Sequence, residues 1–344
     1  MARADDKSRL RWKLAEQDAT DALFPDETVA QRHVGRGEFA GMEFLHVNAR
    51  SIINSVPTTS RMPFRHTINA YRGCSHACRY CFARPTHEYL GLGIGEDFER
   101  KIVVKVNAVE RLRAELRAPA WRGRPIAMGT NTDPYQHAEG KYHLTRGIVG
   151  VLGQVRNPFS ILTKSTLVLR DLDLLASTAA RTVVRVDLSI GTLDRDVWRL
   201  TEPGTPPPDR RVDAVRRLNE AGVPCGVLIA PILPGLSDGE DQVRAVADAC
   251  LEAGAVSITA IPLHLRTGVR EHYLSWLSSA RPDLAGLYEE RFENRSYQLA
   301  GEQARLAGLA PAVGRYPATT GRDAPFPSVQ ARPLGRPVEQ LRLI

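Results

Sequence analysis

The sequence has no long hydrophobic run and few cysteines, and each absence excludes a class of protein. No stretch of about 18 apolar residues occurs among the 344 residues, so a membrane-spanning helix is not expected. The N-terminal segment MARADDKSRLRWKLAEQDAT is charged and has no apolar core like that of a secretory signal. Five cysteines in a chain of this length are too few for a disulfide scaffold. These absences predict a cytoplasmic globular protein without a membrane partner.

The net charge of the chain is moderately positive. The formal net charge is +7, and arginine supplies most of the positive charge. A basic protein can bind nucleic acid, although charge alone does not require it. With 43% hydrophobic and 25% charged residues, the composition is that of an ordinary globular domain. A nucleic-acid substrate is therefore compatible with the sequence.

Short apolar runs rich in β-branched residues alternate with helical patterns from about residue 66. The expected strands are 66–71, 125–131, 159–164, 182–190, 224–232 and 255–262. The expected helices are 102–117, 142–155, 172–180, 208–221, 238–253, 269–279 and 283–301. This alternation predicts a parallel sheet covered by helices, and six such units fit an open (β/α)6 barrel better than a closed eightfold one. Active sites of such barrels lie at the C-terminal ends of the strands.

The pattern also divides the chain into four parts. We expect an N-terminal extension at 1–60, a core barrel at 61–264, a C-terminal helical region at 265–315 and an irregular tail at 316–344. The extension is polar and irregular in pattern, apart from a short helix expected at 5–18. The tail is rich in proline, glycine and arginine, which disfavour regular structure.

Three of the five cysteines lie close together. Cys74, Cys78 and Cys81 have the spacing C-x3-C-x2-C and follow the first expected strand. Three thiolates can bind three irons of a cubane cluster and leave the fourth iron without a protein ligand. The alternative is a zinc site with His76 or His87 as fourth ligand, although structural zinc sites usually contain separated C-x2-C pairs. The spacing favours a [4Fe–4S] cluster.

The motif around these cysteines resembles that of the radical S-adenosylmethionine (radical SAM) superfamily. The segment NAYRGCSHACRYCFAR has an aromatic residue, Tyr80, just before the last cysteine, as members of that superfamily do. Five later segments resemble, in order, those of the spore photoproduct lyase-like group, also called DNA repair photolyase-like. They are GTNTDPYQ, LTKSTLVLRDLDLL, SIGTLD, TEPGTPPPDRR and IAPILPG. The resemblance covers about residues 48–300 and implies a partial (β/α)6 TIM-type barrel.

The resemblance implies an enzyme that cleaves S-adenosylmethionine reductively. In the superfamily the open iron binds the amino and carboxylate groups of this cofactor. An electron from the cluster then releases a 5′-deoxyadenosyl radical, which takes hydrogen from the substrate. The resemblance also implies an electron donor of the flavodoxin or ferredoxin type and admits a nucleic-acid substrate. The alternative is a nucleic-acid-binding iron–sulfur protein whose cluster is structural.

The resemblance assigns cofactor contacts to residues near the expected strand ends. Tyr80 corresponds to an aromatic residue beside the adenine, and Thr132 with Asp133 to a step at the methionine end. Lys164 corresponds to a lysine near the cofactor carboxylate, and Ser189 to a serine near the cofactor. From the residues alone, a turn before Pro134 is the alternative for Asp133, and a polar strand end is the alternative for Ser189. Lys164 ends an apolar run, where a cation needs a partner.

Other polar residues of these segments have plain structural explanations. The segment 202–204 resembles a family segment, but a loop that leads into a helix explains it too. Arg210 and Arg211 begin the next expected helix and are expected to be solvated or paired. The turn at 231–235 is expected to shape the floor of the pocket.

Two positions depart from the pattern of the group. Spore photoproduct lyase returns hydrogen to its product radical from a cysteine after the second strand, where this chain has Thr130. It also has a tyrosine after the third cluster cysteine, where this chain has Phe82. A hydroxyl O–H bond is far stronger than a thiol S–H bond, and phenylalanine has no phenol. We therefore do not expect this chain to repair spore photoproduct by that route, and we expect Cys225 and Cys250 to be buried, unreactive thiols.

Overall fold

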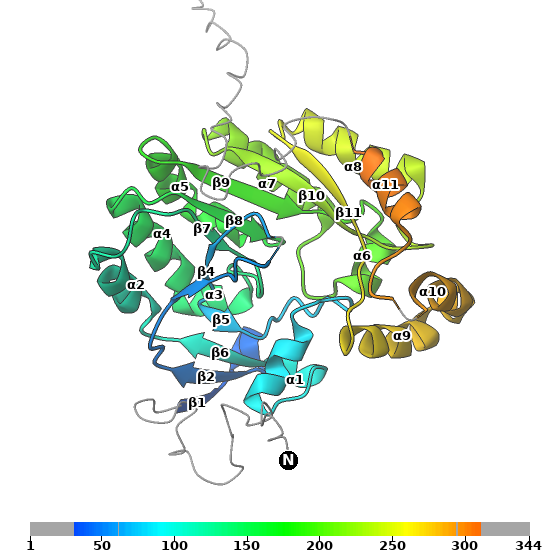
Figure 1. The fold of residues 1–344 in the computed structure, drawn as a ribbon, viewed down its shortest axis with the longest axis horizontal. Helices are drawn as coiled ribbons and strands as arrows, with labels where there is room; N and C mark the ends of the chain where they lie inside the picture. The colour runs from blue at the N-terminus through cyan, green and yellow to red at the C-terminus, as the bar shows by residue number, and fades with distance from the viewer. Residues whose placement is uncertain (1–30, 61, 294, 311–344) are drawn as a thin grey trace, which may run out of the picture.

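The computed structural model describes residues 31–60, 62–293 and 295–310, and its centre is a seven-stranded sheet (Figure 1). The strand order is β11-β10-β9-β8-β7-β4-β3. The parallel strands are β4 (His66–Ile68), β7 (Ile126–Met128), β8 (Phe159–Thr163), β9 (Val184–Ser189), β10 (Cys225–Ile232) and β11 (Ile258–Pro262). Strand β3 (Ile53–Ser55) pairs antiparallel with β4 at one edge. The sheet is thus open, which confirms the expected partial barrel.

Helices cover the outer face of this sheet (Figure 1). They are α2 (Ala108–Arg117), α4 (Leu144–Gln154), α5 (Leu172–Ala179), α7 (Pro208–Glu220), α8 (Glu240–Glu252) and α11 (Ala300–Gly308). The alternation in β9 explains the layering: Val184, Val186 and Leu188 belong to the main hydrophobic core. The intervening residues, of which Ser189 lines the inner cavity, point to the other face. The sequence predicted all six parallel strands and most of these helices.

A second, four-stranded sheet was not expected from the sequence. Its order is β1 (Gln31–Val34), β2 (Glu43–Val47), β6 (Lys101–Lys105) and β5 (Tyr71–Arg72). The prediction that residues up to 60 are irregular is therefore wrong for 31–34, 43–47 and 53–55, and the prediction of a helix from 102 is wrong up to 105. The run Ile102-Val103-Val104 is buried on both faces, and such a β-branched run favours a strand.

The C-terminal region is helical but divided. Helix α9 (Val269–Ala280) is followed by η4 (Pro282–Leu284), α10 (Ala285–Phe292) and α11, so the single helix expected at 283–301 is wrong. The chain between α10 and α11 instead returns to the segment that follows β11, where the Leu265 amide donates to the Ser296 carbonyl over 2.8 Å. The helix expected at 5–18 and the tail expected at 316–344 lie outside the described residues.

The remaining helices are short and lie in the connections. They are η1 (Gly37–Phe39), η2 (Arg84–Leu90), α1 (Glu96–Arg100), α3 (His137–Tyr142), η3 (Thr166–Asp171) and α6 (Arg195–Thr201). In the described part of the chain, no helix has the length and apolar character that crossing a bilayer requires.

Candidate active site

A cavity of about 220 Å³ lies at the carboxyl ends of the parallel strands. The loop after β5 contributes Cys74, Cys78, Cys81 and Tyr80 to its wall. The ends of β7, β8 and β9 contribute polar groups, which are Asn131, Asp133, Lys164 and Ser189. Apolar side chains from β8, β10 and β11 complete the lining, among them Leu162, Leu228 and Ile261. The position agrees with the strand direction, because the carboxyl ends of parallel strands meet at one edge.

The cysteine loop is held in a fixed shape. Gly73 has φ of +78°, and a Cβ there would lie 2.8 Å from the His87 ring and 2.9 Å from the Lys101 carbonyl oxygen, so only glycine fits. The fully buried Arg84 donates from Nη2 to the Cys78 carbonyl over 2.9 Å and to Glu99 over 2.6 Å. These contacts fix the backbone that carries the three thiols.

The three thiols line one cavity, where ligands that each bind a different iron would lie. Cys74 and Cys78 are 6% exposed, and burial raises the pKa of all three thiols. Such thiols bind metal as thiolates by releasing their protons. Within 31–60, 62–293 and 295–310, no three His, Cys, Asp or Glu side chains are arranged around a single metal ion. A cubane does not need such an arrangement, because each thiolate has its own iron.

The two histidines of the zinc alternative lie differently with respect to the thiols. The Nε2 atom of His87 lies 2.9 Å from the Lys101 carbonyl oxygen, and His87 does not line the cavity. The Nδ1 atom of His76 lies 3.3 Å from the Asp133 carboxylate. Each ring thus has one nitrogen engaged, and of the two residues only His76 lines the cavity that the thiols share.

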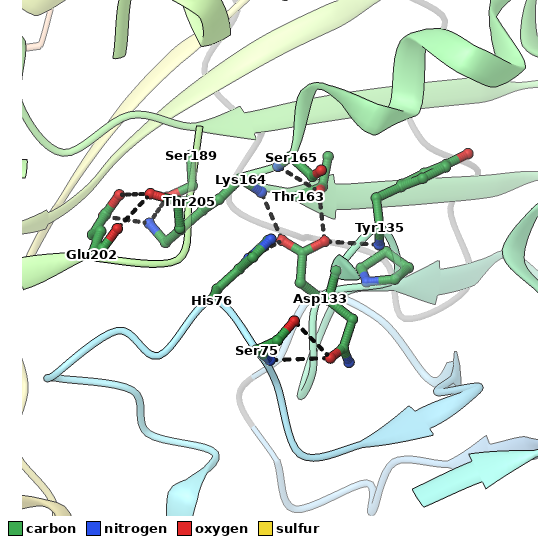
Figure 2. A network of polar contacts seen from close by, with 12 residues as sticks. Ser75, His76, Asp133, Tyr135, Thr163, Lys164, Ser165, Ser189, Glu202 and Thr205 are labelled. Carbon is green, nitrogen blue, oxygen red and sulfur yellow. Dashed lines mark hydrogen bonds and ion pairs between the residues drawn. The ribbon is translucent and has the colours of Figure 1, made fainter. Parts of the chain in front are cut away.

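Asp133 joins three of the loops around the cavity (Figure 2). Its Oδ1 accepts hydrogen bonds from the Thr163 hydroxyl over 2.6 Å and the Tyr135 amide over 2.9 Å. Its Oδ2 accepts one from the Lys164 amide over 2.7 Å and faces His76. Burial alone would raise the pKa of Asp133, but His76 and the hydrogen bonds from Thr163 and the Lys164 amide lower it. All four acceptor positions of the carboxylate are thus used inside the protein.

Lys164 lies at the centre of a second polar network. Its Nζ donates to the Ser189 hydroxyl over 2.7 Å and to the Ala230 carbonyl over 3.1 Å, and it lies 3.0 Å from Glu202 Oε1. The ammonium also lies 5.6 Å from the centre of the Tyr80 ring. The cation at the end of β8 therefore has the partners that its burial requires.

Glu202 connects this lysine to two further residues. The Tyr80 hydroxyl donates to its Oε1, and Arg211 Nη2 donates to its Oε2 over 2.5 Å. Burial alone would raise the pKa of Glu202, but the charges of Arg211 and Lys164 hold it well below its usual value. Arg211 is only 1% exposed and also donates to the Ser189 carbonyl over 2.9 Å. It is therefore paired, which was one of the two expected states.

Sequence reasoning missed the part that Glu202 and Arg211 play. Glu202 lies in the segment TEPGTPPPDRR, so the resemblance pointed to it, but a helix-leading loop explained it equally well. The pairing of Glu202 with Lys164 joins positions 38 residues apart (202 − 164), and no spacing rule predicts such a contact. Asn131, which was not predicted, and His76, which was named only as a possible zinc ligand, line the same cavity.

The structure brings most of the predicted cofactor residues together. Tyr80, Asp133, Lys164 and Ser189 line the cavity. Thr132 does not: it is 3% exposed, and its hydroxyl donates to the Tyr71 carbonyl over 2.9 Å.

Of the remaining predicted residues, some line the cavity and others do not. Phe82 lines the cavity, whereas Thr130 does not. Pro231, at the start of the expected floor, also lines it. Cys225 and Cys250 are completely buried free thiols, as expected.

Comparison with known proteins identifies the class of this site. The family model described as the radical SAM superfamily matches residues 68–247. An uncharacterized protein of Mycobacterium tuberculosis is 43% identical over 286 residues, which are 83% of this chain and 84% of the relative. An uncharacterized protein of Methanocaldococcus jannaschii is 33% identical over 58% of this chain and 71% of the relative. The chain belongs to the radical SAM superfamily.

The solved structures agree in fold. Spore photoproduct lyase complexed with dinucleoside spore photoproduct is 21% identical and has a TM-score of 0.51, covering 69% of this chain and 67% of that one. The chain therefore has the spore photoproduct lyase-like fold of a radical SAM enzyme. Membership of the superfamily implies an iron–sulfur cluster, S-adenosylmethionine and a source of electrons.

Proposed function

We propose that Cys74, Cys78 and Cys81 hold a [4Fe–4S] cluster with which the protein cleaves S-adenosylmethionine. The observation that carries this proposal is the shared cavity: the three thiols face the same space as Lys164 and Ser189. When bound, the cluster and S-adenosylmethionine supply a 5′-deoxyadenosyl radical that takes hydrogen from the substrate. A flavodoxin- or ferredoxin-type protein supplies the electron.

In this proposal Lys164 receives the carboxylate of the cofactor, and Ser189 lies beside it. The Lys164 ammonium is held by Glu202 and lies over the Tyr80 ring, so its position is fixed before a ligand arrives. A carboxylate would replace the Ser189 hydroxyl as an acceptor from Lys164, because that hydroxyl also has the Ala230 carbonyl, 2.8 Å away, as a partner. The Tyr80 ring then offers an apolar face to the adenine.

Asp133 and Thr132 act as positioning residues at the methionine end. Asp133 joins the loop after β7 to Lys164 and to His76, which lies between two of the cysteines. Thr132 ties the same loop to the backbone of Tyr71, just before the cysteine loop. Together they set the distance between the thiols and the strand ends.

The substrate in this proposal is a nucleic acid, but not spore photoproduct. Support for a nucleic acid comes from the net charge of +7 and from the fold of a lyase that was solved with a dinucleoside. Thr130 and Phe82 stand where that lyase has its hydrogen-donating pair, so the product radical must be resolved differently. The reaction is therefore a different one on a related scaffold.

The test of this function is anaerobic. The purified protein is reconstituted with iron and sulfide, reduced with dithionite and given S-adenosylmethionine, and 5′-deoxyadenosine is measured. The proposal predicts slow formation of 5′-deoxyadenosine even without substrate. A protein whose cluster is only structural would contain iron and sulfide but form none.

A further inference from the structure

Three aromatic rings form a continuous row at the mouth of the cavity. Phe82 directly follows Cys81, His264 follows β11, and Tyr297 lies between α10 and α11. The ring centroids of Phe82 and His264 are 6.2 Å apart, and those of His264 and Tyr297 are 5.5 Å apart with planes inclined by 21°. Phe82 and His264 line the cavity itself. The row therefore leads from the cysteine loop to the protein surface.

The two outer rings of this row are unusually accessible. Phe82 is 46% exposed and Tyr297 is 48% exposed. A single exposed aromatic residue is ordinary, but these two are joined through His264 and are continuous with the cavity. An antiparallel backbone bridge holds His264 and Tyr297 side by side. A fixed and exposed row of rings is a surface on which another planar ring can stack.

Two exposed arginines lie close in sequence to the row. Arg266 and Arg295 are exposed, and each lies two residues from a ring of the row, His264 and Tyr297 respectively. Burial, together with the charge of Arg266, lowers the pKa of His264, which favours the neutral imidazole. Aromatic faces beside arginine side chains match a planar base carried on an anionic backbone.

We propose that Phe82, His264 and Tyr297 form a stacking platform that receives an unpaired base of a single-stranded nucleic acid. The platform deepens the proposed function and rests on it, because it places the nucleotide beside the cavity where the radical would form. A base inside a duplex is covered by its neighbours on both faces. The platform therefore selects a single strand, or a base displaced from its stack, over intact duplex.

The test measures binding by fluorescence anisotropy with a labelled, short single-stranded oligonucleotide of mixed sequence. Tyr297→Leu and His264→Leu should each weaken its binding by about fivefold or more, because they remove a stacking ring. Tyr297→Phe keeps the ring and should bind normally, which separates lost stacking from damage to the fold. Tyr89→Leu is the matched control, because Tyr89 is 64% exposed in η2 and does not line the cavity.

Two further probes test whether the platform binds the bases of the strand and whether it requires a single strand. An abasic strand of equal length keeps the phosphates but has no bases, so it should bind the wild-type protein more weakly and be insensitive to Tyr297→Leu. The same sequence as a duplex should also bind more weakly than the single strand. Deoxyribose and ribose versions of the strand distinguish DNA from RNA as its source. Unchanged binding in both leucine variants, or equal binding of abasic and normal strands, would overturn the platform.

The binding assay is independent of the radical chemistry. It uses reconstituted protein without reductant, while 5′-deoxyadenosine formation is measured separately on the same preparation. Cleavage of S-adenosylmethionine without strand binding would reject the platform alone. Strand binding without cleavage would reject the proposed function alone.

Discussion

The two ends of the large sheet carry similar residues in different surroundings. At the carboxyl end, Cys74 and Lys164 line a cavity, and Glu202 pairs with Lys164 behind its wall. Toward the amino end, Cys225 begins β10, and Arg185 lies 2.7 Å from Asp187 on β9. These groups are buried too, but they do not line that cavity. Thiols and buried ion pairs therefore do not mark a site by themselves, and their position along the strands separates the two roles.

Removing a thiol should have the largest effect on cluster content, and only at the carboxyl end of the sheet. Cys74→Ala, Cys78→Ala and Cys81→Ala each remove an iron ligand, so we expect loss of the intact cluster. Cys225→Ala and Cys250→Ala should retain the wild-type iron and sulfide content. The measurements are iron and sulfide analysis and visible absorbance after anaerobic reconstitution. An equal loss of iron and sulfide in Cys225→Ala and Cys250→Ala would contradict this difference between the two ends.

Neutralising one carboxylate at each end of the large sheet should test the same difference between the two ends. Glu202→Gln removes the carboxylate that pairs with the buried Arg211, and Asp187→Asn removes one charged partner of the buried Arg185. Each change should destabilise the protein by about 3–5 kcal/mol. Only Glu202→Gln should also weaken S-adenosylmethionine binding, because Glu202 holds Lys164. Chemical denaturation and isothermal titration calorimetry measure the two effects. A comparable loss of affinity in Asp187→Asn would contradict the assignment of the network to the cofactor.

The lysines allow a test of similar design with a smaller effect. Lys164→Met removes a charged hydrogen bond of about 1.5–3 kcal/mol, so the affinity for S-adenosylmethionine should fall about tenfold or more. Lys105→Met is the control, because Lys105 is also buried, at the end of β6, but does not line the cavity. Calorimetry on cluster-loaded protein gives both affinities. If Lys105→Met lowers the affinity as much as Lys164→Met, Lys164 has no specific part in binding.

The stability of the protein at acid pH should depend on the network around Glu202. The folded-state pKa of Glu202 lies below its usual value of 4.5, because Arg211 and Lys164 stabilise the carboxylate. Its stabilising contribution is therefore complete above about pH 4.5 and is lost as the pH falls below that value. In denaturation experiments at several pH values, the stability of Glu202→Gln should fall less steeply with decreasing pH than that of the wild-type protein. Equal slopes would show that Glu202 is not strongly paired.

The smallest expected signal is repair of spore photoproduct itself. The reduced, reconstituted protein should release almost no thymine dinucleotide from the dinucleoside lesion, because Thr130 and Phe82 provide no hydrogen donor. Product analysis by chromatography measures the yield. Rapid and clean repair would mean that another group returns the hydrogen atom.

Much of the barrel could be predicted because its pattern is local. Each parallel strand is a short β-branched run, and helices such as α7 show helical spacing of Val215 and Leu218. The cysteine loop was equally readable, since its three thiols lie in one short segment. Strand direction then placed Lys164 and Ser189 at the same edge, where the structure has them.

The missed features depend on contacts between distant segments. Strand β6 looked like the start of a helix, because its pairing partner β2 is far away in sequence. Glu202 could not be assigned, since its partners Tyr80 and Lys164 come from two other segments. The row of Phe82, His264 and Tyr297 likewise joins three segments that no periodicity connects.

The most direct test of the central claim is formation of 5′-deoxyadenosine by the wild-type protein. The protein is reconstituted anaerobically, reduced with dithionite and incubated with S-adenosylmethionine, with Cys78→Ala and Cys225→Ala treated in parallel. We predict 5′-deoxyadenosine from the wild type and from Cys225→Ala, and none from Cys78→Ala. Iron- and sulfide-loaded wild-type protein that forms no 5′-deoxyadenosine would contradict the claim that the carboxyl end of the sheet is a radical SAM active site.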